Sequence, residues 1–142
     1  MITMKNVLSF IILLFGILAF SSSVFAQRGF EDYGTEEGIR IQYSWGREKI
    51  TKAEGNAALS LRLTNTHDYP VRVVLDVSFY RDHLELFESR GNVYCLEAGQ
   101  SLRGALAGMR FVAEGVSLSD VREEWFSWEV AEITVEEISG CK

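Results

Sequence analysis

The sequence holds two histidines, and each lies beside an aspartate, the pairing that acid–base catalysis and metal binding use. His67 precedes Asp68, and His83 follows Asp82. A predicted strand separates the two pairs, and an extended chain of that length spans up to ~50 Å at about 3.3 Å per residue. We therefore expect the pairs at opposite ends of the domain, each in a turn. They predict neither a catalytic nor a metal site.

The other reactive side chains also lack the spacing that catalysis requires. No serine stands in a Gly-x-Ser-x-Gly motif, and the sequence has no glycine-rich phosphate loop and no EF-hand pattern of acids. Glu136 and Glu137 are adjacent, but neighbouring residues of a strand point to opposite faces and cannot act on one atom. We predict that the protein is not an enzyme and holds no cofactor. A weak surface Ca²⁺ site in the acidic C-terminal third is the alternative.

Cys95 and Cys141 are the only two cysteines. An even number of cysteines in an exported chain favours a disulfide, which here would tie down the C-terminus. The bond would close a loop of about 47 residues and contribute ~4 kcal/mol in the chain-entropy treatment. Two cysteines and two distant histidines do not supply a zinc site. Intermolecular pairing and free thiols are the alternatives.

Aromatic residues are the best candidates for a ligand-binding surface. Trp125, Tyr80 and Trp45 could stack on sugar rings if their faces are exposed near acids. In the competing interpretation, Trp45 and Trp128 belong to the core and Trp125 closes one end of a sheet.

Residues 1–26 have the three parts of a secretory signal peptide. Lys5 supplies the positive charge, residues 7–20 are apolar, and Val24 and Ala26 occupy the −3 and −1 positions of a cleavage site. As a helix, the apolar run of about 14 residues spans roughly 21 Å, less than the ~30 Å membrane core. We expect cleavage, a secreted or periplasmic location, and no stable membrane anchor. An uncleaved N-terminal anchor is the alternative.

The chain is acidic, with 14 Lys and Arg against 20 Asp and Glu and a net charge of −6. Loss of Lys5 with the signal peptide makes the net charge −7. Such a charge repels nucleic acid and anionic lipid head groups, so we predict neither as a partner. The net charge does not indicate whether the partner is a protein or a glycan, and it does not predict the oligomeric state.

Alternating apolar and polar residues predict strands through most of the region after the signal peptide. Residues 27–38 lack this alternation and are predicted to form a flexible N-terminal arm. Asp82-His83 predicts a tight hairpin turn, and a phase change near Ala131-Glu132 predicts a β-bulge. An all-β, seven-stranded antiparallel β-sandwich over residues 39–142 follows. The predicted strands are residues 39–45, 59–64, 71–80, 84–89, 93–96, 102–112 and 126–135.

Four short segments between residues 57 and 138 carry a recurrent pattern of strand ends and turns: Leu63-Thr64-Asn65, Tyr69-Pro70-Val71, the run from Val77 to Asp82, and the run from Leu96 to Ser101. This pattern resembles immunoglobulin-like and fibronectin-III-like modules of bacterial secreted and envelope proteins. The ending Trp128-Glu129-Val130 is similar to small secreted proteins of Bacteroidetes-type bacteria. The resemblance implies a fold and a location, and no catalytic residues. Ala98 stands where Pro is usual, and His83 where Gly is usual.

Together these observations predict a secreted, non-catalytic binding or interaction module of the bacterial envelope, with an unknown partner. A carbohydrate-binding module that uses exposed aromatic residues is the alternative. A small hydrolase or metal enzyme is the third hypothesis, and the lack of a spaced catalytic motif argues against it.

Overall fold

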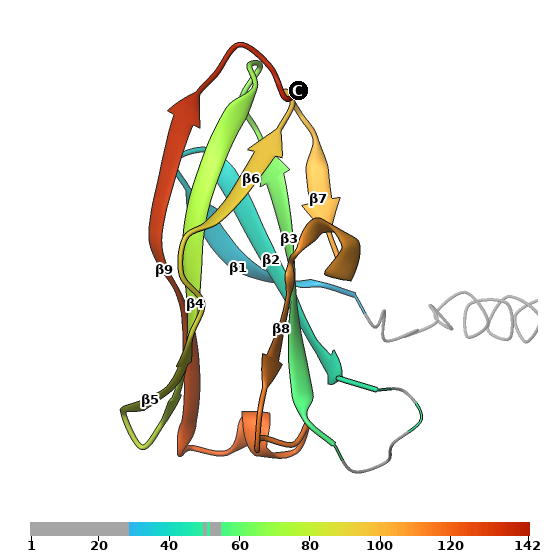
Figure 1. Cartoon of the computed structure of the whole chain (residues 1–142), viewed down its shortest axis with the longest axis vertical. Helices are drawn as coiled ribbons and strands as arrows, with labels where there is room; N and C mark the ends of the chain where they lie inside the picture. Colours follow the sequence, from blue (N-terminus) through green and yellow to red (C-terminus); the bar gives the residue numbers. More distant parts are fainter. Residues whose placement is uncertain (1–28, 50, 52–54) are drawn as a thin grey trace, which may run out of the picture.

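The computed structural model describes residues 29–49, 51 and 55–142 (Figure 1). The predicted signal peptide, residues 1–26, lies outside the described residues. Nine strands and two short 3₁₀ turns make up the described part, so the expected all-β class is confirmed. The strands are β1 Glu31–Glu36, β2 Ile39–Arg47, β3 Ala57–Asn65, β4 Val71–Arg81, β5 Leu84–Glu88, β6 Asn92–Leu96, β7 Ser101–Arg103, β8 Arg110–Ala113 and β9 Phe126–Glu137; the turns are η1 Ala105–Ala107 and η2 Asp120–Arg122.

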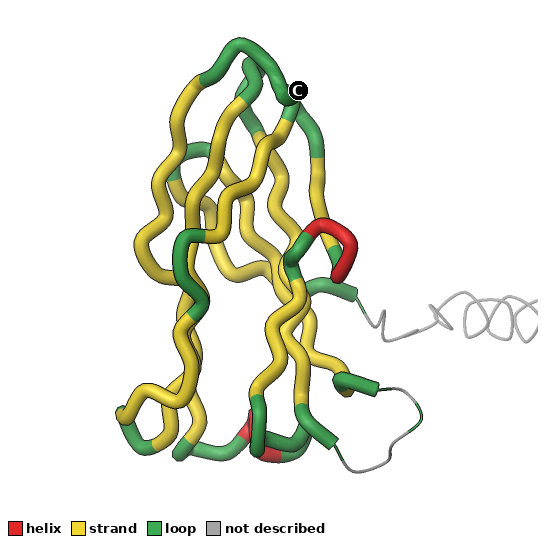
Figure 2. Tube along the Cα trace, viewed as in Figure 1, coloured by secondary structure: helices red, strands yellow, loops and turns green. Residues whose placement is uncertain are grey.

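The strands form two antiparallel sheets that face each other as the layers of a sandwich. In sheet A, β1, β2 and β3 lie side by side, and β7 and β8 share the far side of β3. In sheet B, β4 is central, with β9 on one side and both β5 and β6 on the other. Figure 2 shows strands in both layers, with the two helical turns in the connections between them. Among the described residues, no helix has the length and apolar character to cross a membrane.

The strand order differs from that of an immunoglobulin constant domain. There the third strand crosses to the second sheet. Here the first three strands all stay in sheet A, and the crossing occurs between β3 and β4. The resemblance therefore holds for the two-sheet, antiparallel architecture.

The alternation read from the sequence sets the register of the sheets, because a slip of one residue would turn every apolar side chain to solvent. Ile41 lies opposite Leu63, and both are fully buried. In β4, the alternate residues Val71, Val73, Leu75, Val77 and Phe79 are also fully buried. These side chains fill the space between the sheets and hold the layers together.

The prediction of a flexible arm is wrong for residues 31–38, which form β1 and the turn into β2. The apolar alternation is missing because β1 is an edge strand that directs one large side chain, Tyr33, toward the core. The Tyr33 ring packs 5.1 Å from that of Trp128, and its hydroxyl accepts a hydrogen bond from the Val130 amide. A register irregularity between Asp32 and Gly34 further hides the period.

The described residues form nine strands rather than the seven predicted, and β1 is one of the two additional strands. The other arises because residues 102–112 do not form one strand. Gly104 (φ +85°) and Gly108 (φ +72°) adopt conformations that favour glycine, and they divide the segment into β7, η1 and β8. Met109, fully buried, follows the break and donates its backbone N–H to the Gly104 carbonyl.

The predicted bulge near Ala131-Glu132 is confirmed. Val74 pairs with Thr134 and Asp76 with Ala131, so two residues of β9 oppose a single residue of β4. Glu132 has a φ of +49°, the left-handed conformation of an inserted bulge residue. The bulge explains why the apolar positions of β9 change phase halfway along the strand.

The hairpin turn between β4 and β5 is built from two residues with positive φ, Asp82 (+48°) and His83 (+68°). Type I′ turns require this geometry, and Asn-Gly adopts it with the least strain. Replacing both residues, Asp82→Asn with His83→Gly, should stabilise the fold by about 1 kcal/mol and raise the melting temperature by roughly 4 °C. Thermal unfolding followed by circular dichroism measures the change. His83→Ala alone should give no increase, and an equal increase there would contradict the turn assignment.

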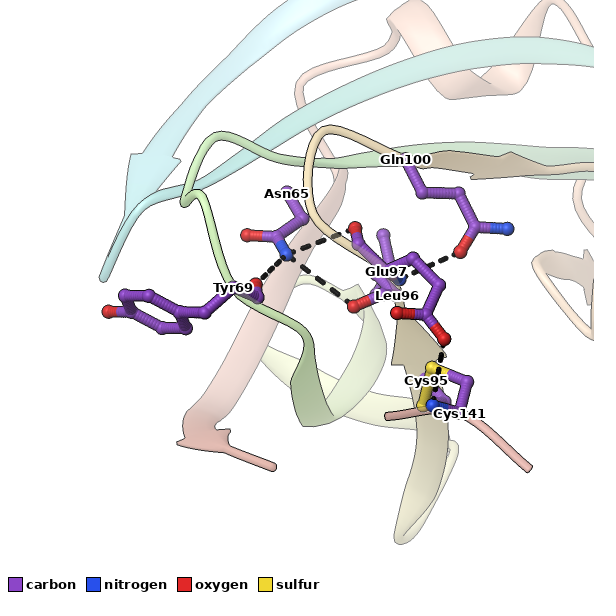
Figure 3. Close-up of a disulfide and its surroundings, with 7 residues drawn as sticks. All are labelled: Asn65, Tyr69, Cys95, Leu96, Glu97, Gln100 and Cys141. Carbon is purple, nitrogen blue, oxygen red and sulfur yellow. Dashed lines mark hydrogen bonds between the residues drawn. A yellow bond between two sulfur atoms is a disulfide. The ribbon is translucent and has the colours of Figure 1, made fainter. Parts of the chain in front are cut away.

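A buried polar network and the disulfide join the loops at the end of the sandwich where the C-terminus lies (Figure 3). The Asn65 side chain is fully buried, and its amide nitrogen donates to the carbonyl oxygens of Tyr69, at 2.8 Å, and Glu97, at 3.2 Å. Cys95 and Cys141 form the predicted disulfide, with 5.7 Å between their Cα atoms. The β3–β4 loop, the β6–β7 turn and the C-terminus are thus linked to one another.

Candidate functional site

The two histidine–aspartate pairs lie in turns at opposite ends of β4, as the sequence predicts. His67 stacks on Tyr69, with 4.5 Å between ring centroids, and its Nε2 lies 2.7 Å from the Glu37 carbonyl oxygen. His83 is exposed in the β4–β5 turn. In the described part of the chain, no three His, Cys, Asp or Glu side chains gather closely enough to hold a metal ion.

The three candidate sugar-binding aromatics do not share a surface. Trp45 lies half-buried between the sheets, with ring centroids 5.6 Å from both Phe79 and Phe126. Trp125 lies just before β9, and the Arg81 guanidinium covers its ring at 4.5 Å. The structure thus places Trp45 with the core and Trp125 beneath an arginine.

Tyr80 lies on the outward face of sheet B, because its neighbour Phe79 is fully buried on the inward face. Its hydroxyl donates a 2.6 Å hydrogen bond to Glu129 on β9. That bond to a carboxylate raises the pKa of Tyr80 above its usual value. The ring is held by Glu129 rather than paired with a second aromatic platform.

A groove of about 340 Å³ opens between the β4–β5 hairpin of sheet B and β8 of sheet A, and we call it the β5/β8 groove. Phe79, Phe111 and Val116, all buried, form its floor. Leu86 and Phe87 form the wall on the β5 side. Most of the lining residues are apolar, which suits the side chains of a bound segment, and polar atoms supply a substantial part of the accessible lining.

Both strands that border the groove are edge strands. In the described part of the chain, β5 pairs with β4 alone and β8 pairs with β3 alone. Each strand therefore presents one edge of backbone N–H and C=O groups without a neighbouring strand. Such an edge is a template for pairing with another chain.

The apolar side chains of β5 are unusually exposed for a short strand. Leu84 is 73% exposed, Leu86 44% and Phe87 36%. A register irregularity makes Leu86 the extra residue, because Phe79 pairs with Phe87 while Tyr80 pairs with Glu85. The bulge places Leu86 in the wall of the groove, beside Phe87.

This groove was not predicted from the sequence. Residues 84–89 were predicted as an ordinary strand, although Leu84, Leu86 and Phe87 occupy both parities of a five-residue segment directly after a tight turn. That departure from strict alternation was the available signal, because a strand with one buried face keeps its apolar residues on one parity. The other half of the groove, β8, depends on the break at Gly104 and Gly108.

Two charged residues stand at the rim of the groove. The Arg110 guanidinium donates hydrogen bonds to the backbone carbonyls of Arg47 and Glu48. These bonds hold the guanidinium beside the C-terminal end of β2. Glu114 supplies the carboxylate. The groove can therefore bury apolar side chains and form backbone hydrogen bonds, and its lining contains no serine, cysteine or histidine nucleophile.

Comparisons with protein-family models, with curated proteins and with solved structures found no match to the chain. The function is therefore inferred from this chain's own residues and geometry.

Proposed function

We propose that the protein is a secreted or periplasmic, non-catalytic interaction module that binds an extended segment of a partner protein in the β5/β8 groove. The observation that carries the proposal is an apolar groove bounded by two strand edges without neighbours in the described structure. Its chemistry is that of β-strand addition, in which backbone hydrogen bonds give affinity and pockets for alternate side chains give specificity.

The partner segment is an extended peptide with apolar residues at every second position. One edge of the segment pairs with β5 or β8, and alternate side chains then point to the floor formed by Phe79 and Phe111. Each apolar side chain fully buried there contributes about 1.5–3 kcal/mol. Polar residues at the intervening positions stay in water.

Exposed apolar edge strands are a liability for an isolated protein, because they pair with other chains indiscriminately. Leu84 and Leu86 create that liability on β5, and a charge at either position would remove it. The exposure of these two leucines on an edge strand supports a surface that is covered when the partner binds.

Export is part of the proposal. It is supported by the signal-peptide pattern of residues 1–26 and by the Cys95–Cys141 disulfide, because disulfides persist in oxidising compartments. The immunoglobulin-like and envelope assignment rests on the resemblance in the middle of the chain. The two-sheet architecture supports it as a scaffold that presents strand edges.

The carbohydrate-binding alternative requires exposed aromatic faces on one surface. Trp45 packs against Phe79 between the sheets, and Trp125 is covered by Arg81. Tyr80 alone stands on the outward face of sheet B. A peptide in the β5/β8 groove therefore agrees better with the arrangement of these side chains.

The proposal predicts that Leu86→Glu weakens peptide binding. A displayed library of random decapeptides should enrich alternating apolar sequences against the purified protein. The affinity of a selected peptide should fall at least about tenfold in Leu86→Glu, because a carboxylate in the apolar wall is desolvated without a partner.

Val93→Glu is the matched control for that experiment. Val93 is 58% exposed on β6 of the same sheet and does not line the groove, so its replacement changes the charge equally. It should leave the affinity within about twofold. Failure to enrich any alternating sequence, or equal losses in the two variants, would contradict the proposed function.

A further inference from the structure

The outward face of sheet A is basic, although the protein as a whole is acidic. In this sheet the inward residues are the buried ones, such as Ile41, Leu63 and Phe111. The residues beside them in sequence point away from the core. Four of these outward residues are arginines: Arg40 on β2, Arg62 on β3, Arg103 on β7 and Arg110 on β8.

Two of these arginines already have polar partners. Arg40 forms an ion pair with Asp32 of β1, at 2.9 Å. Arg110 donates to the two backbone carbonyls at the rim of the groove. Arg62 and Arg103 differ, because within the described residues neither has a carboxylate in ion-pair range.

Arg62 and Arg103 lie directly opposite each other on neighbouring strands. Side chains in this position have Cβ atoms about 4.5–5.5 Å apart, and like charges there destabilise the sheet. The Phe30 ring packs over the Arg62 guanidinium, with 4.2 Å between Cζ and the ring centroid. This contact covers one face of the planar guanidinium group of Arg62 and leaves the N–H groups along its edge available to bind an anion.

Polar groups that bind sugars and oxyanions surround the pair. Thr64 and Ser101 are opposite each other in the next row, and their hydroxyls share a 2.7 Å hydrogen bond. Gln42 lies opposite Arg62 on the β2 side. An oxyanion bound between the two guanidinium groups would replace their mutual repulsion with attraction to its negative charge. The hydroxyl groups of Thr64 and Ser101 and the amide of Gln42 lie close enough to contribute further hydrogen bonds.

The opposite face of the sandwich, the outward face of sheet B, is negatively charged. On sheet B, Arg72 is accompanied at outward positions by acids of β4, β5 and β9. These acids are Asp76, Glu85, Glu88, Glu129 and Glu136. The repulsion of anions expected from the net charge therefore does not apply to sheet A, because the field near a face follows its local charges within about 10 Å.

We propose that the outward face of sheet A binds an anionic glycan, a polysaccharide chain that bears sulfate or phosphate esters, with Arg62 and Arg103 as the binding pair. The inference does not rest on the β5/β8 groove, which opens between the sheets rather than on this face.

The surroundings of the pair favour a narrow polysaccharide over a membrane or a nucleic acid. The β1 strand and its turn border the face with acids, among them Glu36 and Glu37, and a flat anionic bilayer would meet them. Single-stranded nucleic acid binds through aromatic platforms, and here the Phe30 ring is already stacked on Arg62. A glycan chain along β3 and β7 meets arginines and hydroxyls.

The test measures binding of a heparin-derived octasaccharide to the exported protein by calorimetry at several salt concentrations. The wild type should bind, with an affinity that falls as salt rises. Arg62→Gln with Arg103→Gln should weaken binding on the order of 100-fold. The matched control is Arg72→Gln with Arg90→Gln, which removes the same charge and breaks the ion pairs with Glu136 and Glu88 on sheet B. It should change the affinity less than about threefold.

A second variant, Arg103→Glu, separates binding from folding. The new carboxylate pairs with Arg62 across the strands, so octasaccharide binding should be lost while the melting temperature does not fall. Equal losses in the sheet A and sheet B variants would overturn the proposal. Tighter binding of polyglutamate, single-stranded DNA or anionic-lipid vesicles than of the octasaccharide at the same salt would also overturn it.

Discussion

Replacing Cys95 and Cys141 by serine should destabilise the protein by about 4 kcal/mol and lower its melting temperature by roughly 15 °C. The disulfide joins residues 46 positions apart, so its loss frees a loop that contains β7 and β8 of sheet A and β9 of sheet B. Most of the effect comes from the larger conformational freedom of the unfolded chain. Thermal unfolding followed by circular dichroism measures the change.

The wild type under a strong reductant is the control, and it should melt near the temperature of the double variant. Replacing Glu97 by alanine should lower the melting temperature by a smaller amount. Its carboxylate accepts a hydrogen bond from the Cys141 amide at 2.9 Å and helps hold the C-terminus in place. A wild-type melting temperature that does not respond to the reductant would refute the assigned stabilising role of the bond.

Asn65→Ala is expected to have the second largest effect, a destabilisation of about 3 kcal/mol. The side chain is fully buried where the β3–β4 loop meets the β6–β7 turn (Figure 3). Its amide donates to the carbonyls of Tyr69 and Glu97, and its oxygen accepts the His67 amide at 3.0 Å. Alanine removes the partner of these part-buried backbone groups, and a backbone group left unsatisfied costs about 1–3 kcal/mol.

Asn56→Ala is the matched control for that substitution. Asn56 also bonds on both sides, to the Glu48 carboxylate and the Gly115 amide, but it is half-buried and water can replace its bonds. Its loss should cost about 1 kcal/mol or less. Chemical denaturation gives both values, and equal costs for the two variants would show that burial of the Asn65 network adds nothing.

The predictable features of this fold have local causes. The alternation of β4 from Val71 to Phe79 selects one register, because only that register buries every second residue. The phase change at Glu132 indicates the bulge, and the two cysteines in an exported chain indicate the disulfide. Each of these signals is contained in a few neighbouring residues.

The features that the sequence did not reveal depend on distant partners. Strand β1 is held by Tyr33 against Trp128, a contact between the two ends of the domain. The groove joins Leu86 of sheet B to Phe111 of sheet A and requires the break at Gly104. None of these contacts has a periodic signal. The sequence also does not show that Arg81 covers Trp125, because only the tertiary structure brings these two side chains together.

If β5 and β8 are the binding edges, amide hydrogen exchange on these two strands should respond to a bound peptide. The ¹⁵N-labelled protein is compared with and without a library-selected alternating peptide. We predict slower exchange of the β5 and β8 amides that do not face β4 and β3, with the rates on β1 and β6 unchanged. Peptide-induced protection confined to other strands or loops, with β5 and β8 unaffected, would show that the peptide does not pair with these edges.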